Sequence, residues 1–241
     1  MKEERFFYVP DAACKKELPQ DEAIHATRVL RLHEGDNIFL MDGKGTFYKA
    51  VVTMTSGKRC TYSIEEELPQ QHPWHGHIHI VMAPTKMMER VEWMAEKATE
   101  IGINELSFIE CRFSERRQLR TDRIEKIVIA AMKQSHKAWK PAVNELCPFE
   151  EFVKQKRDGS KFICHCYNEI EKKNLFNILQ TQSDKDEDIT ILIGPEGDFS
   201  MEEVKQALQY GFQSVSLGTS RLRTETAALS AVMMAQLTRQ E

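Results

Sequence analysis

The sequence predicts an α/β protein built from two parts, a small β unit over residues 1–70 and a larger α/β domain over residues 71–241. Short strand-like runs separated by turn signals fill the first part, which is typical of a small barrel or sandwich. From residue 79 onward strands and helices alternate, which indicates a mostly parallel sheet with helices on both faces. Between them, residues 68–76 are rich in Pro and Gln and read as a linker.

In the first part, the apolar runs predict four strands and one helix. The strands are expected at 5–9, 37–41, 46–54 and 59–64, and the helix at 21–32. Asp42-Gly43 is a hairpin signal, because Gly adopts the positive φ that tight hairpin turns require. The helix carries Arg28 and Arg31 beside its apolar residues.

In the second part, strands are expected at 79–83, 106–109, 162–165, 189–193 and 215–217, and helices at 87–101, 122–138, 174–179, 200–211 and 224–237. Gly102 fits the end of its helix, and Ser200 with Glu203 fits a capping box. Met87, Met88, Trp93 and Met94 lie at helical spacing and are interpreted as core. Residues 183–188 are interpreted as an acidic surface loop.

The composition is that of an ordinary globular protein, with 41% hydrophobic and 29% charged residues. No apolar run approaches the roughly 20 residues that a membrane span needs. The polar start of the chain predicts no signal peptide, and six scattered cysteines are typical of reduced thiols. These features predict a cytoplasmic protein.

The net charge of −4 is unevenly distributed. Residues 112–140 contain nine Lys or Arg against three acids, so this segment carries +6 and the rest of the chain −10. A basic patch can bind phosphate on an acidic protein, because only the patch makes contact. A solvated helix face with internal ion pairs is the simpler interpretation of such a run.

Two loops near the C-terminus carry the strongest functional signal. Ile193-Gly194-Pro195-Glu196-Gly197 follows one buried strand, and Ser216-Leu217-Gly218 through Thr226 follows the next. Ligands bind at the carboxyl ends of strands in open α/β sheets, and Gly lets the backbone approach them closely. The second loop also brings two arginines to a helix N-terminus, where anions are favoured. Together these loops predict a pocket for a small polar ligand.

These loops resemble those of the RsmE family of RNA methyltransferases. The matching residues are Ile193–Phe199 and Leu217–Ala227, with Asp198 where the family usually has a second Gly. Lys97–Gly102, Met132–Ser135 with Lys140-Pro141, and His25 with Val29–Arg31 also resemble family motifs, so the likeness covers nearly the whole chain.

The resemblance implies a C-terminal SPOUT domain with a trefoil knot, a PUA-like N-terminal β-barrel that binds RNA, and a homodimer. It implies transfer of a methyl group from S-adenosylmethionine to N3 of a uridine in 16S rRNA of the small ribosomal subunit. The implied cofactor residues are Ile193, Gly194, Pro195, Glu196, Gly197, Ser216, Leu217, Gly218, Leu222, Thr226 and His165. The expected RNA contacts are Arg28, Arg31, Arg112, Arg116, Arg117 and Arg120.

The chemistry needs a cation and a base. Removing the N3 proton of uridine spreads negative charge onto O2 and O4, which a guanidinium stabilises. Arg221, Arg223 and Arg5 are the candidates, and Glu225 or Glu196 is the candidate base. Alternatively, either glutamate pairs with an arginine and has a structural role.

Two other functions compete with methyl transfer. A non-catalytic RNA-binding protein would use the β unit and the basic segment, but has no need of the paired loops. An unrelated nucleotide-binding enzyme is disfavoured, because neither Gly-rich phosphate-binding motif is present. Metal binding is not expected, since the histidines at 72, 75, 77 and 79 lack clustered Cys or acidic partners.

Overall fold

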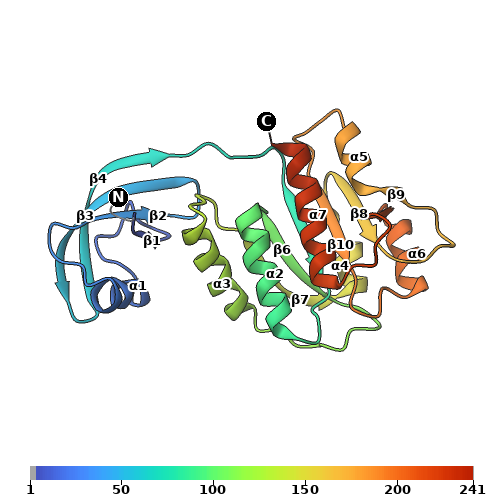
Figure 1. Ribbon diagram of the computed structural model, residues 1–241, viewed down its shortest axis with the longest axis horizontal. Coiled ribbons are helices and arrows are strands. Elements are labelled where there is room, and N and C mark those ends of the chain that lie inside the picture. The colour runs from blue at the N-terminus through green and yellow to red at the C-terminus, as the bar shows by residue number, and fades with distance from the viewer. Residues whose placement is uncertain (1–3, 241) are drawn as a thin grey trace. The chain divides into compact units, whose positions relative to one another are not determined.

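The computed structural model describes residues 4–240. By internal contacts the chain forms two compact units. The first reaches to His72 and includes Ile129–Lys140, and the second comprises Pro73–Val128 and the chain from Pro141 onward (Figure 1). The sequence gives no sign that residues 129–140 belong with the first unit. The boundary between the two units falls inside the predicted helix 122–138.

The first unit contains a four-stranded sheet in the order β1-β2-β3-β4. Its elements are β1 (Phe6–Tyr8), α1 (Gln20–Ile24), the π-helix η1 (His25–Val29), β2 (Asn37–Met41), β3 (Thr46–Ser56) and β4 (Arg59–Pro69). The four predicted strands are confirmed, although β4 extends into the expected linker. Asp42 Oδ1 accepts hydrogen bonds from the backbone of Lys44 and Thr46, which closes the β2–β3 turn.

The core of the first unit lies under this sheet. Phe7, Ile38, Leu40 and Tyr62 are almost fully buried in it, beside Ala23 of α1. Two register shifts between β3 and β4 mark irregularities of the long hairpin, and such bulges increase the local twist of a sheet.

The second unit is built on a seven-stranded sheet in the order β7-β6-β5-β10-β8-β11-β9, with every neighbouring pair parallel. The strands are β5 (Ile78–Met82), β6 (Glu105–Glu110), β7 (Ala142–Pro148), β8 (Ser160–Cys164), β9 (Lys173–Asn174), β10 (Ile189–Ile193) and β11 (Gln213–Ser216). The predicted parallel sheet is confirmed. Strands β7 and β9 were not predicted.

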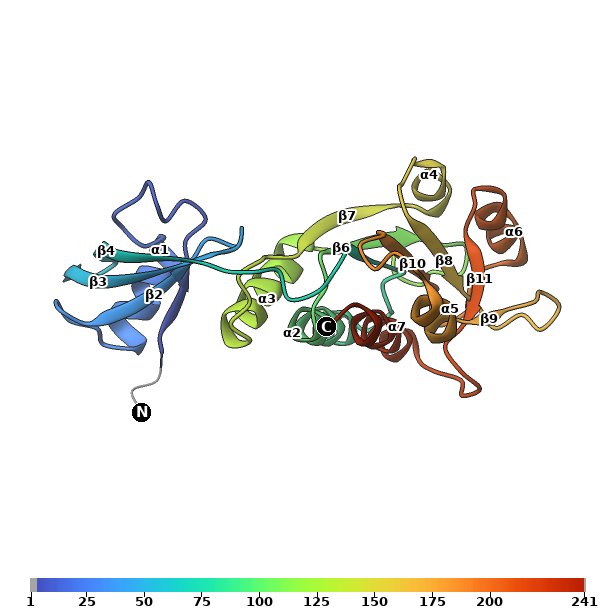
Figure 2. The ribbon, with the colours of Figure 1, turned by 90° about the horizontal axis from the view of Figure 1, so that it is seen from above.

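Helices cover both faces of this sheet (Figure 2). They are α2 (Met88–Ile101), α3 (Thr121–Gln134), α4 (Phe149–Lys154), α5 (Leu175–Thr181), α6 (Met201–Gln209) and α7 (Thr224–Arg239). Helices α2, α5 and α7 pack on one face, and α4 and α6 on the other. The Ser200–Glu203 capping box is present, and Gly102 ends α2 at φ 126°. No helix among residues 4–240 is long and apolar enough to cross a membrane.

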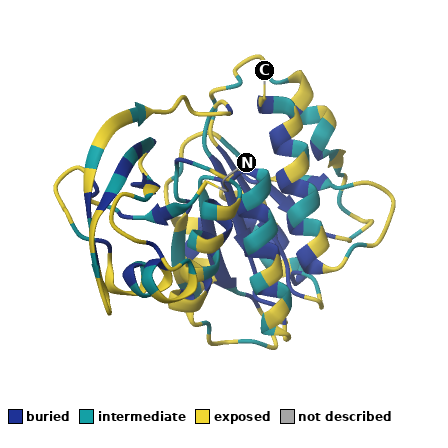
Figure 3. Ribbon diagram, turned by 60° about the vertical axis from the view of Figure 1, so that its left-hand side comes forward, coloured by how far each residue is buried: buried dark blue, intermediate teal, exposed yellow. Residues whose placement is uncertain are grey.

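Burial follows these layers, with the sheet strands mostly buried and the outer faces of the helices exposed (Figure 3). Met94 lies in the core as expected. The interpretation of Met87 and Trp93 as core residues is wrong, because they are 48% and 46% exposed. Trp93 directly precedes Met94 on α2, and adjacent helical residues face in different directions.

The order of the strands differs from their order in the chain. The chain runs from β5 outward to β6 and β7, then returns to form β8 on the other side of β5. Strand β10 is inserted between β5 and β8, and all five of its residues are buried. The carboxyl ends of β10, β8 and β11 are therefore consecutive along one edge of the sheet.

Candidate active site

The register of the sheet brings the two predicted loops and His165 to one edge. Ile193 at the end of β10 pairs with Cys164 of β8, which pairs in turn with Val215 of β11. The next residues along the three strands are Gly194, His165 and Ser216. Strand β8 thus lies between the two Gly-containing loops, an arrangement that their order in the sequence does not show.

The loop after β10 folds tightly on itself. A Cβ added at Gly194 would lie 3.1 Å from the backbone nitrogen and the ring of Phe199. A Cβ at Gly197 would lie 3.1 Å from Cβ of Phe113. Both distances are tighter than ordinary contacts, so a side chain at either glycine would require Phe199 or Phe113 to shift by a few tenths of an ångström, whatever ligand the loop holds.

Asp198 stands where the resembled family usually has Gly, and its backbone shows why Gly suits the position. Its φ is 67°, in the left-handed region that Asp tolerates better than most residues. Its carboxylate accepts hydrogen bonds of 2.8 Å from the backbone N–H of Cys166 and from that of Phe199. Asp198 therefore keeps the turn and also ties this loop to the end of β8.

Glu196 accepts a hydrogen bond from a backbone N–H group and not from one of the arginines considered above. Its Oε1 accepts a hydrogen bond of 2.9 Å from the backbone N–H of Lys86, in the loop after β5. Arg116 holds the same loop from the other side, because its guanidinium donates to the carbonyls of Thr85 and Lys86. The loop after β5 is thereby fixed beside the loop after β10.

The loop after β11 is more open. Leu217 packs on the core and Leu222 is half-buried, whereas residues 218–221 are exposed. Gly218 has φ 122° with no atom within 4 Å of an added Cβ. Here the backbone angle, and not crowding, requires Gly.

His165 lies between these loops and is 6% exposed. Its Nε2 is 3.0 Å from Oγ of Ser214, and its Nδ1 is buried without a hydrogen-bond partner among the described residues. Burial, reinforced by Lys172, lowers the pKa of His165 below its ordinary value. The ring is therefore neutral near pH 7 and presents an unused polar atom.

At the start of α7, Arg223 is the N-cap residue and is exposed, as is Arg221. Within residues 4–240 neither arginine has an acidic group within ion-pair distance. Glu225 is 6% exposed; its Oε1 lies 3.6 Å from Nε of Arg90, and its Oε2 is buried without a partner in the described chain. Arg90, on α2, was not singled out from the sequence, because the α2 pattern gives no sign of contact with α7.

The remaining candidates lie elsewhere. Thr226 is exposed in the first turn of α7, and Pro195 is buried beside Gly194. Arg5 lies in the first unit, 3.7 Å from Asp36. Within the described residues, no three His, Cys, Asp or Glu side chains form a group that could hold a metal ion.

The four arginines after β6 each have a partner within the second unit. Arg112 pairs with Glu202, Arg117 with Glu110 and Arg120 with Asp122. These three side chains are more than 60% exposed, so water and ions reach the pairs. Arg116 differs, since it is half-buried and bonded to backbone carbonyls. Its predicted phosphate contact would compete with that structural role.

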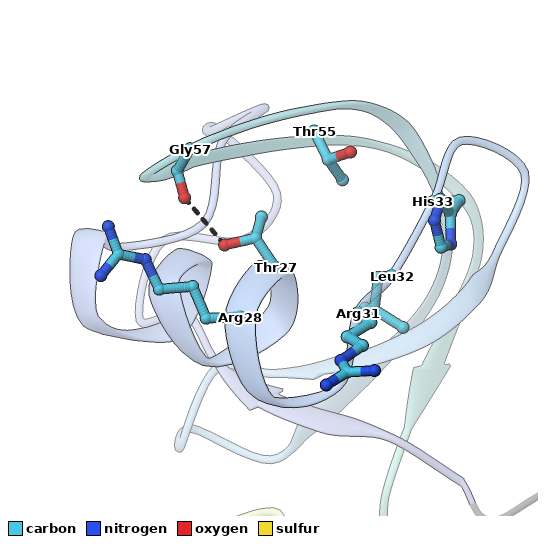
Figure 4. A pocket seen from close by; sticks show the side chains of 7 residues that line it. All are labelled: Thr27, Arg28, Arg31, Leu32, His33, Thr55 and Gly57. Carbon is cyan, nitrogen blue, oxygen red and sulfur yellow. Dashed lines mark hydrogen bonds between the residues drawn. The ribbon is translucent and has the colours of Figure 1, made fainter.

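In the first unit, Arg28 and Arg31 line a shallow hollow of about 450 Å³ (Figure 4). Thr27, Leu32, His33, Thr55 and Gly57 complete its lining. The hydroxyl of Thr27 donates to the carbonyl of Gly57, which fixes η1 against the β3–β4 turn. Arg31 has φ 51°, so the chain bends sharply where η1 ends.

Comparison with known proteins identifies the family to which this chain belongs. Residues 72–236 match the RNA methyltransferase domain, and residues 18–65 match the RNA methyltransferase PUA domain. A ribosomal RNA small subunit methyltransferase E from Rickettsia conorii is 27% identical over 225 residues, which cover 92% of this chain and 90% of the relative.

Two solved structures are similar throughout. A probable rRNA-methyltransferase from Porphyromonas gingivalis is 43% identical, with 95% of each chain covered and a TM-score of 0.86. A ribosomal RNA small subunit methyltransferase E from Neisseria gonorrhoeae, bound to S-adenosyl methionine, is 28% identical, with 98% of each chain covered and a TM-score of 0.85. Because these matches span both units and include the loops after β10 and β11, the chain belongs to the RsmE family of RNA methyltransferases.

Proposed function

We propose that this protein transfers a methyl group from S-adenosylmethionine to N3 of a uridine in 16S rRNA of the small ribosomal subunit. The observation that carries the proposal is the register of β10, β8 and β11, which brings two Gly-containing loops and His165 to one edge of the sheet. Relatives that cover most of this chain are named as small-subunit rRNA methyltransferases, and the structure of one of them holds S-adenosyl methionine.

The residues at this edge suit that cofactor. Two polar atoms, Nδ1 of His165 and Oε2 of Glu225, are buried without partners in the described residues, and a polar ligand would satisfy them. We assign Ile193–Gly197, Ser216–Gly218, Leu222, Thr226 and His165 to cofactor binding. The cofactor supplies a methyl group already activated by its sulfonium.

For the chemistry, the protein needs to stabilise the uracil anion and remove the N3 proton. Arg221 and Arg223 are exposed and free of ion pairs in the described chain, so either can meet developing charge on the ring. We keep Arg5 as a third candidate. Glu225 and Glu196 remain the two candidate bases, each with one oxygen already near a donor.

For RNA binding, we assign residues 1–70 to recognition and residues 71–241 to methyl transfer. The hollow beside Arg28 and Arg31 supports a phosphate contact on the first unit. Arg112, Arg117 and Arg120 are exposed enough to exchange their acidic partners for phosphates. Because the proposed substrate is ribosomal, we expect the protein in the cytoplasm.

We also propose a homodimer and a trefoil knot. Met233 and Leu237 on α7 are 44% and 62% exposed, and they line a hollow with Phe176 of α5 that a second copy could cover. The knot is proposed from membership of the RsmE family. Sedimentation analysis of wild type and a Leu237→Glu variant tests the dimer.

The function is tested with small ribosomal subunits from cells that lack this enzyme and with S-adenosylmethionine labelled in its methyl group. We expect label in RNA, and nucleoside mapping should find it on N3 of one uridine. A reaction without the protein serves as the negative control. Binding to subunits without methyl transfer would instead favour a non-catalytic RNA-binding protein.

A further inference from the structure

Phe113 is an exposed aromatic residue on a well-anchored loop. It lies just after β6 and is 46% exposed, although Phe is usually buried. Hydrogen bonds surround it: Cys111 N–H donates to Oγ of Ser114 at 2.9 Å, and Arg112 N–H donates to Glu203 at 2.8 Å. The backbone that carries the exposed ring is therefore held in place by hydrogen bonds.

The base of the Phe113 side chain packs against Gly197, in the loop after β10 that we assign to cofactor binding. A Cβ at Gly197 would come within 3.1 Å of Phe113 Cβ, so the two backbones approach as closely as a missing side chain allows. Phe113 thus stands next to the residues assigned to the cofactor, on the side of the sheet edge toward β6. An RNA base that reaches the cofactor from this side meets the phenyl ring.

Positive charge accompanies the ring. The guanidinium of Arg112 lies 5.7 Å from the ring centroid. Its ion pair with Glu202 joins two strongly exposed side chains, and such pairs contribute little and exchange readily. An aromatic face with a neighbouring arginine is the combination that proteins use to stack a nucleic-acid base and hold its phosphate.

We propose that Phe113 is a substrate-binding residue that stacks on an RNA base beside the methyl-transfer site. This proposal rests on the function proposed above and adds a residue that the family motifs do not include. Enzymes that modify a base take it out of its helix, and aromatic side chains compensate for the lost stacking. Phe113 would hold the extruded uridine or stabilise the strand around it through that contact.

The test compares steady-state methyl transfer to small subunits by wild type, Phe113→Ala, Phe113→Leu and Phe113→Trp. Loss of one stacked base typically weakens binding by about 5-fold to 150-fold, so we expect KM for subunits to rise by that factor in Phe113→Ala. Phe113→Leu keeps apolar bulk without a π face and should resemble Ala. Phe113→Trp should retain near wild-type KM, and its fluorescence should be quenched by added subunits.

Three controls separate this proposal from other roles. Tyr210→Ala removes another exposed aromatic side chain, which is 39% exposed at the C-terminal end of α6, and should change nothing. Calorimetric affinity for S-adenosylmethionine should stay unchanged in Phe113→Ala, because the ring contacts RNA and not cofactor. Sedimentation should show the same oligomeric state as wild type.

The proposal is overturned if Phe113→Ala or Phe113→Leu has wild-type KM and kcat on subunits. It is also overturned if Phe113→Ala loses only cofactor affinity, which would make the ring a support for Gly197, or if it changes oligomeric state, which would make the ring a subunit contact. Wild-type protein that transfers no methyl group to subunits would refute the proposed function itself.

Discussion

A network of polar side chains at the amino ends of the seven-stranded sheet differs from two buried polar residues at its carboxyl ends. At the amino ends, Asn144 donates to both Glu105 and Ser107, and His79 lies 2.7 Å from the same serine hydroxyl. His77 lies 2.9 Å from the second carboxylate oxygen of Glu105. At the carboxyl ends, by contrast, His165 and Glu225 each keep a buried polar atom without a partner among the described residues.

An unpaired buried atom does not by itself identify a functional group. Nε of Arg157 and Nε of Arg239, near the amino ends, are also unpaired among the described residues, although both side chains donate through other nitrogens. Buried polar atoms in folded proteins nearly always have a hydrogen-bond partner, because an unpaired one costs about 1–3 kcal/mol. The amino-end network meets that requirement by itself and needs no ligand. The carboxyl-end atoms do not, so their partners are expected to come with bound cofactor or RNA.

The largest expected effect is at the carboxyl ends. Arg223→Ala should lower the single-turnover methyl-transfer rate by about 100-fold to 1,000-fold, the usual loss for one donor that stabilises developing charge. Arg223→Lys should recover little, because an ammonium lacks the planar two-pronged geometry of guanidinium. Rates are measured with saturating subunits and cofactor, after binding of both is checked. A near wild-type rate would transfer the role to Arg221 or Arg5.

The second prediction concerns pH and the amino ends. Burial lowers the pKa of His79 from 6.5 to about 3, and a hydrogen bond from His77 lowers the pKa of Glu105 from 4.5 to about 2. In both cases the unfolded chain binds the proton more tightly. The contribution of His79 to the free energy of unfolding should therefore fall as the pH drops from 6.5 toward 3. The contribution of Glu105 should fall as the pH drops from 4.5 toward 2.

For His79, the free energy of unfolding should change by up to about 1.4 kcal/mol per pH unit. Urea unfolding between pH 4 and 6 measures it, and His79→Gln should flatten the curve. His33→Gln, at an exposed histidine of the first unit, is the matched control. If His79→Gln keeps the wild-type slope, the amino-end network is not the source of acid sensitivity.

A smaller effect is expected at Asp198. This residue lies in the loop after β10, but its carboxylate accepts hydrogen bonds from the protein's own backbone. Asp198→Ala removes two hydrogen bonds to backbone N–H groups and puts a less tolerant residue at φ 67°. We expect a loss of about 1–2 kcal/mol in the free energy of unfolding. Asp198→Gly should lose less, because Gly relieves the backbone angle. Equal losses in both variants would mean that the φ value costs nothing.

The smallest effect is expected from single surface arginines. Arg117→Gln should lower the salt dependence of subunit binding by roughly one unit of slope if it contacts one phosphate. Arg116→Gln should instead weaken cofactor binding with the salt slope intact, because Arg116 holds the loop after β5. An identical change of slope for both variants would contradict this division of roles.

The sequence predicts elements best where burial is complete. Strand β10 was predicted with its observed bounds, since Ile189–Ile193 is apolar except for Thr190 and all five residues are buried. Strand β7 was missed because Ala142–Pro148 is half-exposed at the sheet edge and its residues show neither a buried run nor a clear alternation. Helix α3 ends at Gln134, short of the predicted 138, where His136 takes φ 50°.

For the candidate site, sequence motifs identify the loops but not the residues and strands that lie beside them in space. The loops after β10 and β11 were visible in the sequence, whereas the position of β8 between them depends on sheet order. The contacts Arg90–Glu225 and Phe113–Gly197 join residues more than eighty positions apart, and Arg90 and Phe113 alone resemble ordinary surface residues. Such pairs become visible only when the chain is folded.

The late insertion of β10 has a consequence for how the protein is made. A ribosome synthesises β5 and β8 before β10, the strand that lies between them, and α7 follows later still. The growing chain can thus form the first unit early, but the centre of its second sheet stays incomplete until nearly the whole chain is released. A chain that has not yet reached β10 therefore lacks both loops proposed to hold the cofactor, so we expect methyl transfer to begin only after β10, β11 and α7 have been synthesised.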